Sequence, residues 1–109
     1  MVIYEVNLAV DPAVDGAYRD WLTEHIQEIL ELDGFESARW LQPDVHKDPD
    51  GWLLHTVQYV LTDQASLDKY FENHASKFRG VGIALFGDKF RASRRILTLR
   101  QGFTAIGGV

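Results

Sequence analysis

A carboxylate and an amide lie two residues apart in an otherwise apolar stretch, residues 2–10. If this stretch is a β-strand, Glu5 and Asn7 share one face with Ile3 and Ala9, because side chains alternate between the two faces of a strand. The remaining apolar side chains form the opposite, core face. A carboxylate becomes a general base when burial raises its pKa, and an amide can orient a carbonyl group or an anion. The strand therefore predicts a polar face that polarises a small ligand.

Other polar side chains are expected on the same face. Thr56 and Gln58 belong to the stretch that should pair with the first strand, and arginines are concentrated near residue 95. The predicted site would hold a small anionic or carbonyl-bearing ligand, with Arg91 near its mouth, and its ligand-binding members are Arg39, Thr56, Gln58, Ser93 and Arg95. A shift of the last strand by one residue would replace Arg95 by Arg94. The alternative is a Glu–Arg network that buries its own charges at a dimer interface.

His74 is the third candidate for catalysis, beside Glu5 and Asn7. It lies on the apolar stripe of a predicted helix that begins after Thr62-Asp63, and from there it would act as an acid or a base. The alternative is a core histidine with a hydrogen bond to the backbone or to Tyr59, because partly buried histidines are common.

The remaining motifs argue against a metal and against a bound cofactor. The sequence contains no cysteine, no His-Glu-x-x-His motif, no phosphate-binding glycine loop and no nucleophile elbow. His25 is expected to be a boundary residue of the first helix, between its buried and its exposed face, rather than a ligand. Trp21, Trp40 and Trp52 are expected to pack in the core or at an interface, although Trp40 or Trp52 could stack on a planar ligand.

The order of elements predicts the fold. Strands are expected at 2–10, 35–41, 52–61 and 90–100, and helices after Asp11-Pro12 and after Thr62-Asp63, with one extra turn near 83–86. With right-handed crossovers, this order gives an α+β, ferredoxin-like βαββαβ domain. Its four-stranded antiparallel sheet has both helices on one face and the first and third strands in the middle.

Length and composition indicate one domain, residues 1–100, and a C-terminal tail, residues 101–109. The tail contains Phe103 and Ile106, so we expect it to dock on a partner subunit. A net charge of −5 argues against nucleic acid as a partner. The sequence has neither a transmembrane stretch nor a signal-like start, and it lacks cysteine, so the protein is expected in the cytoplasm and away from membranes.

Several stretches resemble a small bacterial family that is classed only as a domain of unknown function within the dimeric α+β barrel superfamily, alongside antibiotic-biosynthesis monooxygenase-like proteins. The resemblance covers nearly the whole chain up to Leu97. It rests on residues 4–8, 34–40, 57–59, 74–75, 86–88 and 90–95.

The resemblance implies a homodimer in which two sheets face one another across a cleft lined by the polar face. The superfamily includes cofactor-free monooxygenases, lactone isomerases and haem-degrading enzymes. His74 resembles the position of the haem ligand in the last group, and Asn7 resembles its polar partner, but Leu67 and Tyr70 occupy the region where those enzymes have a tryptophan.

The sequence thus predicts a small-molecule-binding protein or a cofactor-independent enzyme of monooxygenase or isomerase type. Two alternatives are a noncatalytic homodimerisation module, with the polar face buried against its twin, and a haem-binding protein that uses His74.

Overall fold

A computed structural model of the chain describes residues 1–107. The first two strands are joined by one helix, the second and third strands by a loop, and the third and fourth strands by two consecutive helices. The elements are β1 (Val2–Val10), α1 (Asp15–Ile29), β2 (Phe35–Leu41), β3 (Leu53–Leu61), α2 (Gln64–Asn73), α3 (Ala75–Phe86) and β4 (Phe90–Thr98).

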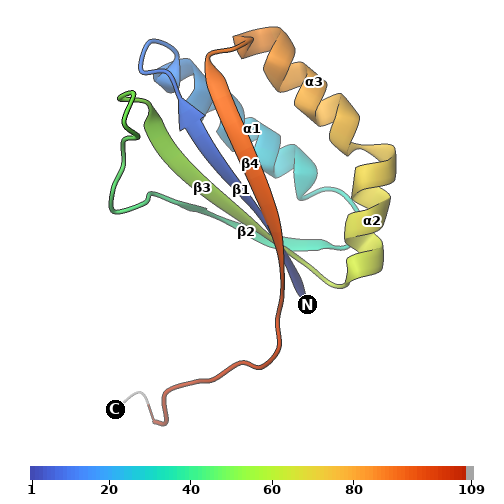
Figure 1. The fold of residues 1–109 in the computed structure, drawn as a ribbon. Coiled ribbons are helices and arrows are strands. Elements are labelled where there is room, and N and C mark those ends of the chain that lie inside the picture. The colour runs from blue at the N-terminus through green and yellow to red at the C-terminus, as the bar shows by residue number, and fades with distance from the viewer. Residues whose placement is uncertain (108–109) are drawn as a thin grey trace.

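The four strands form one antiparallel sheet in the order β2-β3-β1-β4. All three helices lie on the same face of this sheet and leave the other face open (Figure 1). The predicted ferredoxin-like α+β fold is confirmed, with β1 and β3 in the middle of the sheet. We refer to the open side of the sheet as the helix-free face.

The first helix begins later than predicted. Asp11 caps a turn instead, because its side chain accepts a hydrogen bond from the backbone N–H of Ala13 at 2.9 Å. The helix itself starts at Asp15 after Val14. Asp11 and Pro12 therefore belong to the turn that leads into α1 and not to the helix itself.

The second predicted helix is two helices, which meet at His74. Asp63 caps α2 as predicted and accepts a hydrogen bond from the backbone N–H of Ser66 at 2.9 Å. The glycines that were expected to interrupt the helical pattern lie inside α3. One of them, Gly82, is buried, and a Cβ atom there would be only 3.2 Å from the ring of Trp21. Close contact with α1 therefore explains this glycine within a helix.

A β-bulge changes the faces of β2. The pairing with β3 shifts between Phe35 and Ser37, so Phe35 packs in the core together with Ala38 and Trp40. Simple alternation had placed Phe35 on the same face as Ser37 and Arg39. The extra residue of a bulge reverses the facing of the residues that follow it.

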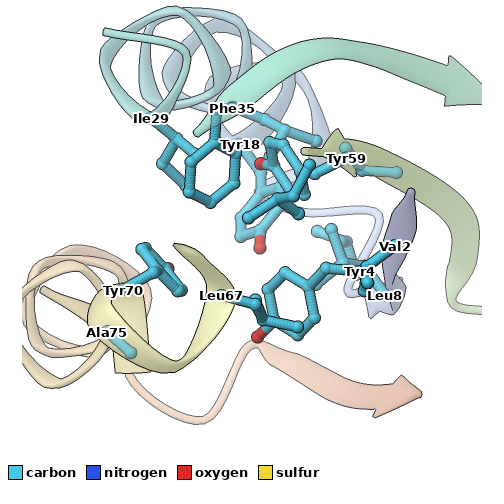
Figure 2. Packing of buried hydrophobic residues seen from close by; sticks show 14 residues of the cluster. Val2, Tyr4, Leu8, Tyr18, Ile29, Phe35, Tyr59, Leu67, Tyr70 and Ala75 are labelled. Carbon is cyan, nitrogen blue, oxygen red and sulfur yellow. The ribbon is translucent and has the colours of Figure 1, made fainter. Parts of the chain in front are cut away.

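The core between sheet and helices is rich in tyrosine. Figure 2 shows Tyr4 and Tyr59 of the sheet, Tyr18 of α1 and Tyr70 of α2 gathered in this layer. Burial disfavours the charged form of a phenol, which raises the pKa of Tyr18 and of Tyr59, and raises that of Tyr70 to about 12. These hydroxyl groups therefore stay protonated at neutral pH.

The chain leaves the sheet after Thr98, two residues earlier than predicted, and extends away from the domain (Figure 1). The exposed fraction of Phe103 is 84% and that of Ile106 is 100%. Residues 108–109 of the predicted tail lie outside the described residues. Within residues 1–107, every helix is too short or too polar to cross a bilayer.

Candidate functional site

Glu5 is at the centre of a hydrogen-bonded network on the helix-free face. It pairs with Gln58 of β3 on one side and with Arg95 of β4 on the other. Its carboxylate accepts hydrogen bonds from Gln58 Nε2 at 2.9 Å, from Asn7 Nδ2 at 3.0 Å and from Arg95 Nε at 2.5 Å. Arg39 and Thr56 extend the network by donating to Gln58 and to Asn7, both at 2.8 Å.

The network favours ionised Glu5. Hydrogen bonds from Arg95, Gln58 and Asn7, in that order, outweigh burial and lower the pKa of Glu5 to about 2. A general base would need a raised pKa, which is the opposite direction. Glu5 is only 4% exposed, and its carboxylate already accepts hydrogen bonds from three neighbouring side chains. In this chain Glu5 therefore acts as the acceptor that organises the polar face.

The structure brings most of the predicted site residues together. Arg95 rather than Arg94 shares a face with Glu5, which settles the register of the last strand. Ser93 pairs with Asn7 and is exposed on the same face. A shallow hollow of about 200 Å³ lies next to them, bordered by Asn7, Leu54, Arg91 and Ser93.

Arg91 joins β4 to the loop between β2 and β3. Its guanidinium group lies 2.6 Å from a carboxylate oxygen of Asp48 and 3.2 Å from one of Asp50, and it sits 4.4 Å from the ring centroid of Trp52. A planar guanidinium suits both kinds of contact. The loop is thereby held at one end of the helix-free face.

The larger cavity lies on the other side of the sheet, where no site had been predicted. It has a volume of about 270 Å³ and lies between the sheet and the helices α1 and α3. Aromatic side chains form much of its wall, including Tyr4, Tyr18, Trp21, Tyr59, Phe78 and Phe90.

Three basic side chains also line this cavity: His25 of α1, Arg79 of α3 and Arg94 of β4. Arg79 donates a hydrogen bond to the hydroxyl of Tyr4 at 3.2 Å. Burial and then the charge of Arg94 lower the pKa of His25 to about 4, so its ring is neutral at pH 7. Sequence reasoning missed this set, although two signals were present. His25 lies on the apolar stripe of its helix, and Arg94 alternates with Phe90 and Ala92 on the core face of β4.

His74 lies apart from both sites. It is the residue between α2 and α3, its ring is half-buried with its centroid 6.4 Å from that of Phe78, and it does not line the cavity. The structure therefore does not bring His74 together with Asn7, which points away on the helix-free face. These positions do not form a haem site.

A second buried polar cluster joins α1 to β3 and β2. His55 Nε2 lies 2.7 Å from Asp15 Oδ1, and Trp40 Nε1 donates to His55 Nδ1 at 3.3 Å. Because Nδ1 accepts, the proton of the neutral ring must lie on Nε2, which donates to Asp15. Both ring nitrogens are thus satisfied, and the cluster is structural.

Residues 1–107 contain no group of three or more His, Asp or Glu side chains that could hold a metal ion. The aspartates of the β2–β3 loop instead pair with Arg91.

The fold is that of the antibiotic biosynthesis monooxygenase-like proteins. A candidate antibiotic biosynthesis monooxygenase from Deinococcus radiodurans superposes with a TM-score of 0.74 at 12% identity, over 98% of this chain and 100% of that chain. A variant of SnoaB, a cofactor-independent oxygenase from Streptomyces nogalater, gives 0.68 at 14% identity, over 95% and 98%. A conserved protein from Methanosarcina mazei gives 0.64 at 18% identity, over 92% and 94%. At such identities the likeness shows the fold alone.

The chain belongs to the family described as DUF4286, a domain of unknown function, whose model matches residues 1–100. A comparison with curated proteins gives no match.

Proposed function

We propose that this protein binds a small, mostly apolar molecule in the cavity between its sheet and α1 and α3. The cavity of about 270 Å³ is the observation that carries the proposal. Protein interiors are close-packed, and an unfilled apolar space lowers stability. A cavity retained in so small a domain therefore supports a binding role. Its size is near the lower end of ligand sites, roughly 300–1,000 Å³, which suits a molecule of one or two rings.

Calorimetric titration with two-ring aromatic probes, both neutral and anionic, tests this proposal. Ala92 lines the cavity from β4, so Ala92→Phe should fill the space and abolish binding. Ala84→Phe is the matched control, because it adds the same bulk at an exposed position of α3. Ala92→Leu serves in its place if Ala92→Phe does not fold. If no probe binds the unaltered protein, or if Ala92→Phe binds as well as the control, the proposal is wrong, and a noncatalytic module becomes the better description.

A second proposal concerns the helix-free face, which we propose pairs with the same face of another copy. Ile3, Leu54, Val60 and Leu97 are only half-buried there and surround the Glu5 network. Apolar side chains on an open sheet face are usually covered by another layer. In this arrangement Glu5 and Arg95 would become interface residues, and the apolar tail, residues 101–109, would dock on the partner.

Sedimentation tests the pairing. The unaltered protein should sediment as a dimer, and Val60→Asp should shift it to a monomer, because the substitution places an unpaired carboxylate in the apolar border. Val81→Asp, on the exposed side of α3, should leave the dimer intact. A monomeric unaltered protein would overturn the pairing. Removal of residues 101–109 should weaken the dimer if the tail docks on the partner.

A candidate reaction is oxygenation of the bound molecule without a cofactor. Its support is the shared fold with SnoaB, which is described as a cofactor-independent oxygenase. The probe is 1,4-dihydroxynaphthalene, a two-ring hydroquinone that supplies the electrons itself: one atom of O2 enters a ring C–H to give 2-hydroxy-1,4-naphthoquinone, and the other leaves as water. The measurement is oxygen uptake above the uncatalysed background that ends in this product rather than in 1,4-naphthoquinone and hydrogen peroxide. Uptake that is lost in Ala92→Phe and retained in Ala84→Phe supports this reaction, whereas uptake equal to background removes it and leaves binding as the proposed function.

A further inference from the structure

Arg94 brings an unneutralised positive charge to the cavity. It pairs with Val6 of β1, so its side chain is on the face that bears the helices. Its neighbour Arg95 forms an ion pair with Glu5, whereas Arg94 has neither a hydrogen bond nor an ion pair with any residue among 1–107. The cavity lining within this part of the chain contains no Asp or Glu. Arg94 is an exposed residue that also lines the cavity, so an anion bound there would supply the counter-ion that it lacks.

His25 faces the same cavity from the helix layer. Its ring is held in place by stacking on Trp21, with centroids 4.6 Å apart and planes 15° apart, and by an edge contact with Phe78 at 5.3 Å. The ring nitrogens make no hydrogen bond with another residue of the described chain, so they are free to meet a ligand. A neutral imidazole supplies one N–H donor and one acceptor.

We propose that His25 and Arg94 together recognise the acidic group of an aromatic anion whose ring lies against Trp21, Phe78 and Phe90. This inference rests on the proposed function and adds the chemical class of the ligand. Arg94 supplies a charge-assisted hydrogen bond, and His25 supplies a second donor from the other wall. Arg94 is exposed, so its bond forms at the solvent-facing edge of the cavity, whereas His25 is partly buried and its bond is better shielded from water.

The proposal predicts that binding takes up a proton. A bound anion favours imidazolium, so it raises the pKa of His25 above its value of about 4 in the free protein. Affinity should therefore be constant at high pH, increase as the pH falls through the pKa of the complex, and level off below about 4.

Other ionisable groups near His25 do not explain such a profile. A guanidinium group stays charged throughout this range, and burial raises the pKa of Tyr18, Tyr59 and Tyr70 still further above it. On α1 itself, Glu24 and Glu28 are exposed and flank the histidine on the solvent side. Both carboxylates remain in His25→Phe, so that variant isolates the contribution of His25.

The test compares naphthalene-2-sulfonate, which stays anionic at every pH used, with the neutral naphthalene-2-sulfonamide. The sulfonate should bind about tenfold more tightly or better, as expected for one charge-assisted hydrogen bond. Arg94→Gln should abolish this preference and leave the sulfonamide affinity unchanged. Arg100→Gln removes the same charge from an exposed position outside the cavity and should retain the preference.

His25→Phe keeps an aromatic ring on Trp21 and removes both nitrogens. It should make sulfonate binding independent of pH between 4 and 7, whereas the unaltered protein gains affinity as the pH falls. If His25→Phe does not fold, calorimetry of the unaltered protein in two buffers of different ionisation enthalpy measures the proton uptake directly. Equal affinity for sulfonate and sulfonamide, or binding without proton uptake, overturns the inference. Failure of both probes instead overturns the proposed binding function itself.

Discussion

Arg94 and Arg95 are consecutive residues of β4, and their side chains lie on opposite faces of the sheet. Arg95 is opposite Glu5 and forms an ion pair with it, and Arg94 is opposite Val6 and lines the cavity. One strand thus supplies a structural arginine to the helix-free face and an unpaired arginine to the helix side. Substitution of each should have a different effect.

Arg95→Gln should reduce the amount of unfolding free energy that the protein loses when the pH is lowered. The pKa of Glu5 is lowered to about 2, with Arg95 as the largest cause, from an unfolded value near 4.5. The stabilisation from this carboxylate is therefore present above the unfolded pKa and is lost as the pH falls toward 2. Without Arg95, the pKa of Glu5 rises, and the stability at pH 7 falls only modestly because Arg95 is largely exposed. The stability of the variant then depends less steeply on pH in acid than that of the unaltered protein.

Urea denaturation at pH 7 and at pH 3 measures this difference. Arg100→Gln is the control, since it removes an exposed arginine that bonds neither to Glu5 nor to His25. If Arg95→Gln loses as much unfolding free energy between pH 7 and pH 3 as the control does, Arg95 does not set the pKa of Glu5.

His25 should also make the protein less stable as the pH falls, but over a higher pH range than Glu5. Its folded pKa of about 4 lies below the ordinary value of 6.5, so the unfolded chain binds more protons between these values. Stability is therefore complete above the unfolded pKa and falls as the pH is lowered toward 4. His25→Phe should flatten this window while the loss due to Glu5, at lower pH, remains. Unchanged pH dependence in His25→Phe would contradict the burial of a neutral ring.

Gly34→Ala should cost more stability than Gly51→Ala. Both glycines have positive φ, 86° and 81°, so alanine is strained at either position by about 1–2 kcal/mol. Only at Gly34 would the new Cβ collide with Ser66, at 2.3 Å, whereas Gly51 has open space around it. The difference in unfolding free energy between the two variants therefore measures the close approach of α2 to the start of β2, and equal losses would argue against that approach.

Asp15→Ala should be much more damaging than Asp15→Asn. Alanine leaves the buried Nε2–H of His55 without an acceptor, at a cost of about 1–3 kcal/mol. Asparagine keeps an oxygen at that position and loses mainly the exposed pair with Arg19, whose contribution is small. Chemical denaturation of the two variants at pH 7 gives both costs. If their stabilities are equal, the proton of His55 is not on Nε2.

The fold was predictable because its signals are local and agree with one another. β1 and β2 have the predicted bounds, and Asp63 caps α2 as expected. The errors occur where tertiary contacts override local pattern. The contact of Gly82 with Trp21 allows a helix to pass through a glycine, and a bulge after Phe35 changes the face of that residue.

The site was harder to predict than the fold. Alternation in β1 identified the polar face correctly, and its residues do form one network. The function of that network depends on pKa, and three hydrogen bonds lower the pKa of Glu5 where burial alone would raise it. The cavity was missed because empty space leaves no periodic pattern, and His25 and Arg94 come from separate elements.

β1 is hydrogen-bonded on both sides, and its two neighbours come from different parts of the chain. Val2 pairs with Leu61 of β3 and with Thr98 of β4, so the central strand of the sheet is completed by the last strand of the domain. Contacts between such distant parts of a chain slow folding, because the intervening loop must close first. During synthesis, β1 leaves the ribosome before β3 and β4, and nearly the whole domain must follow before its second edge is covered. Until then, that edge is open to other chains, so correct assembly depends on how well it is protected in the interval.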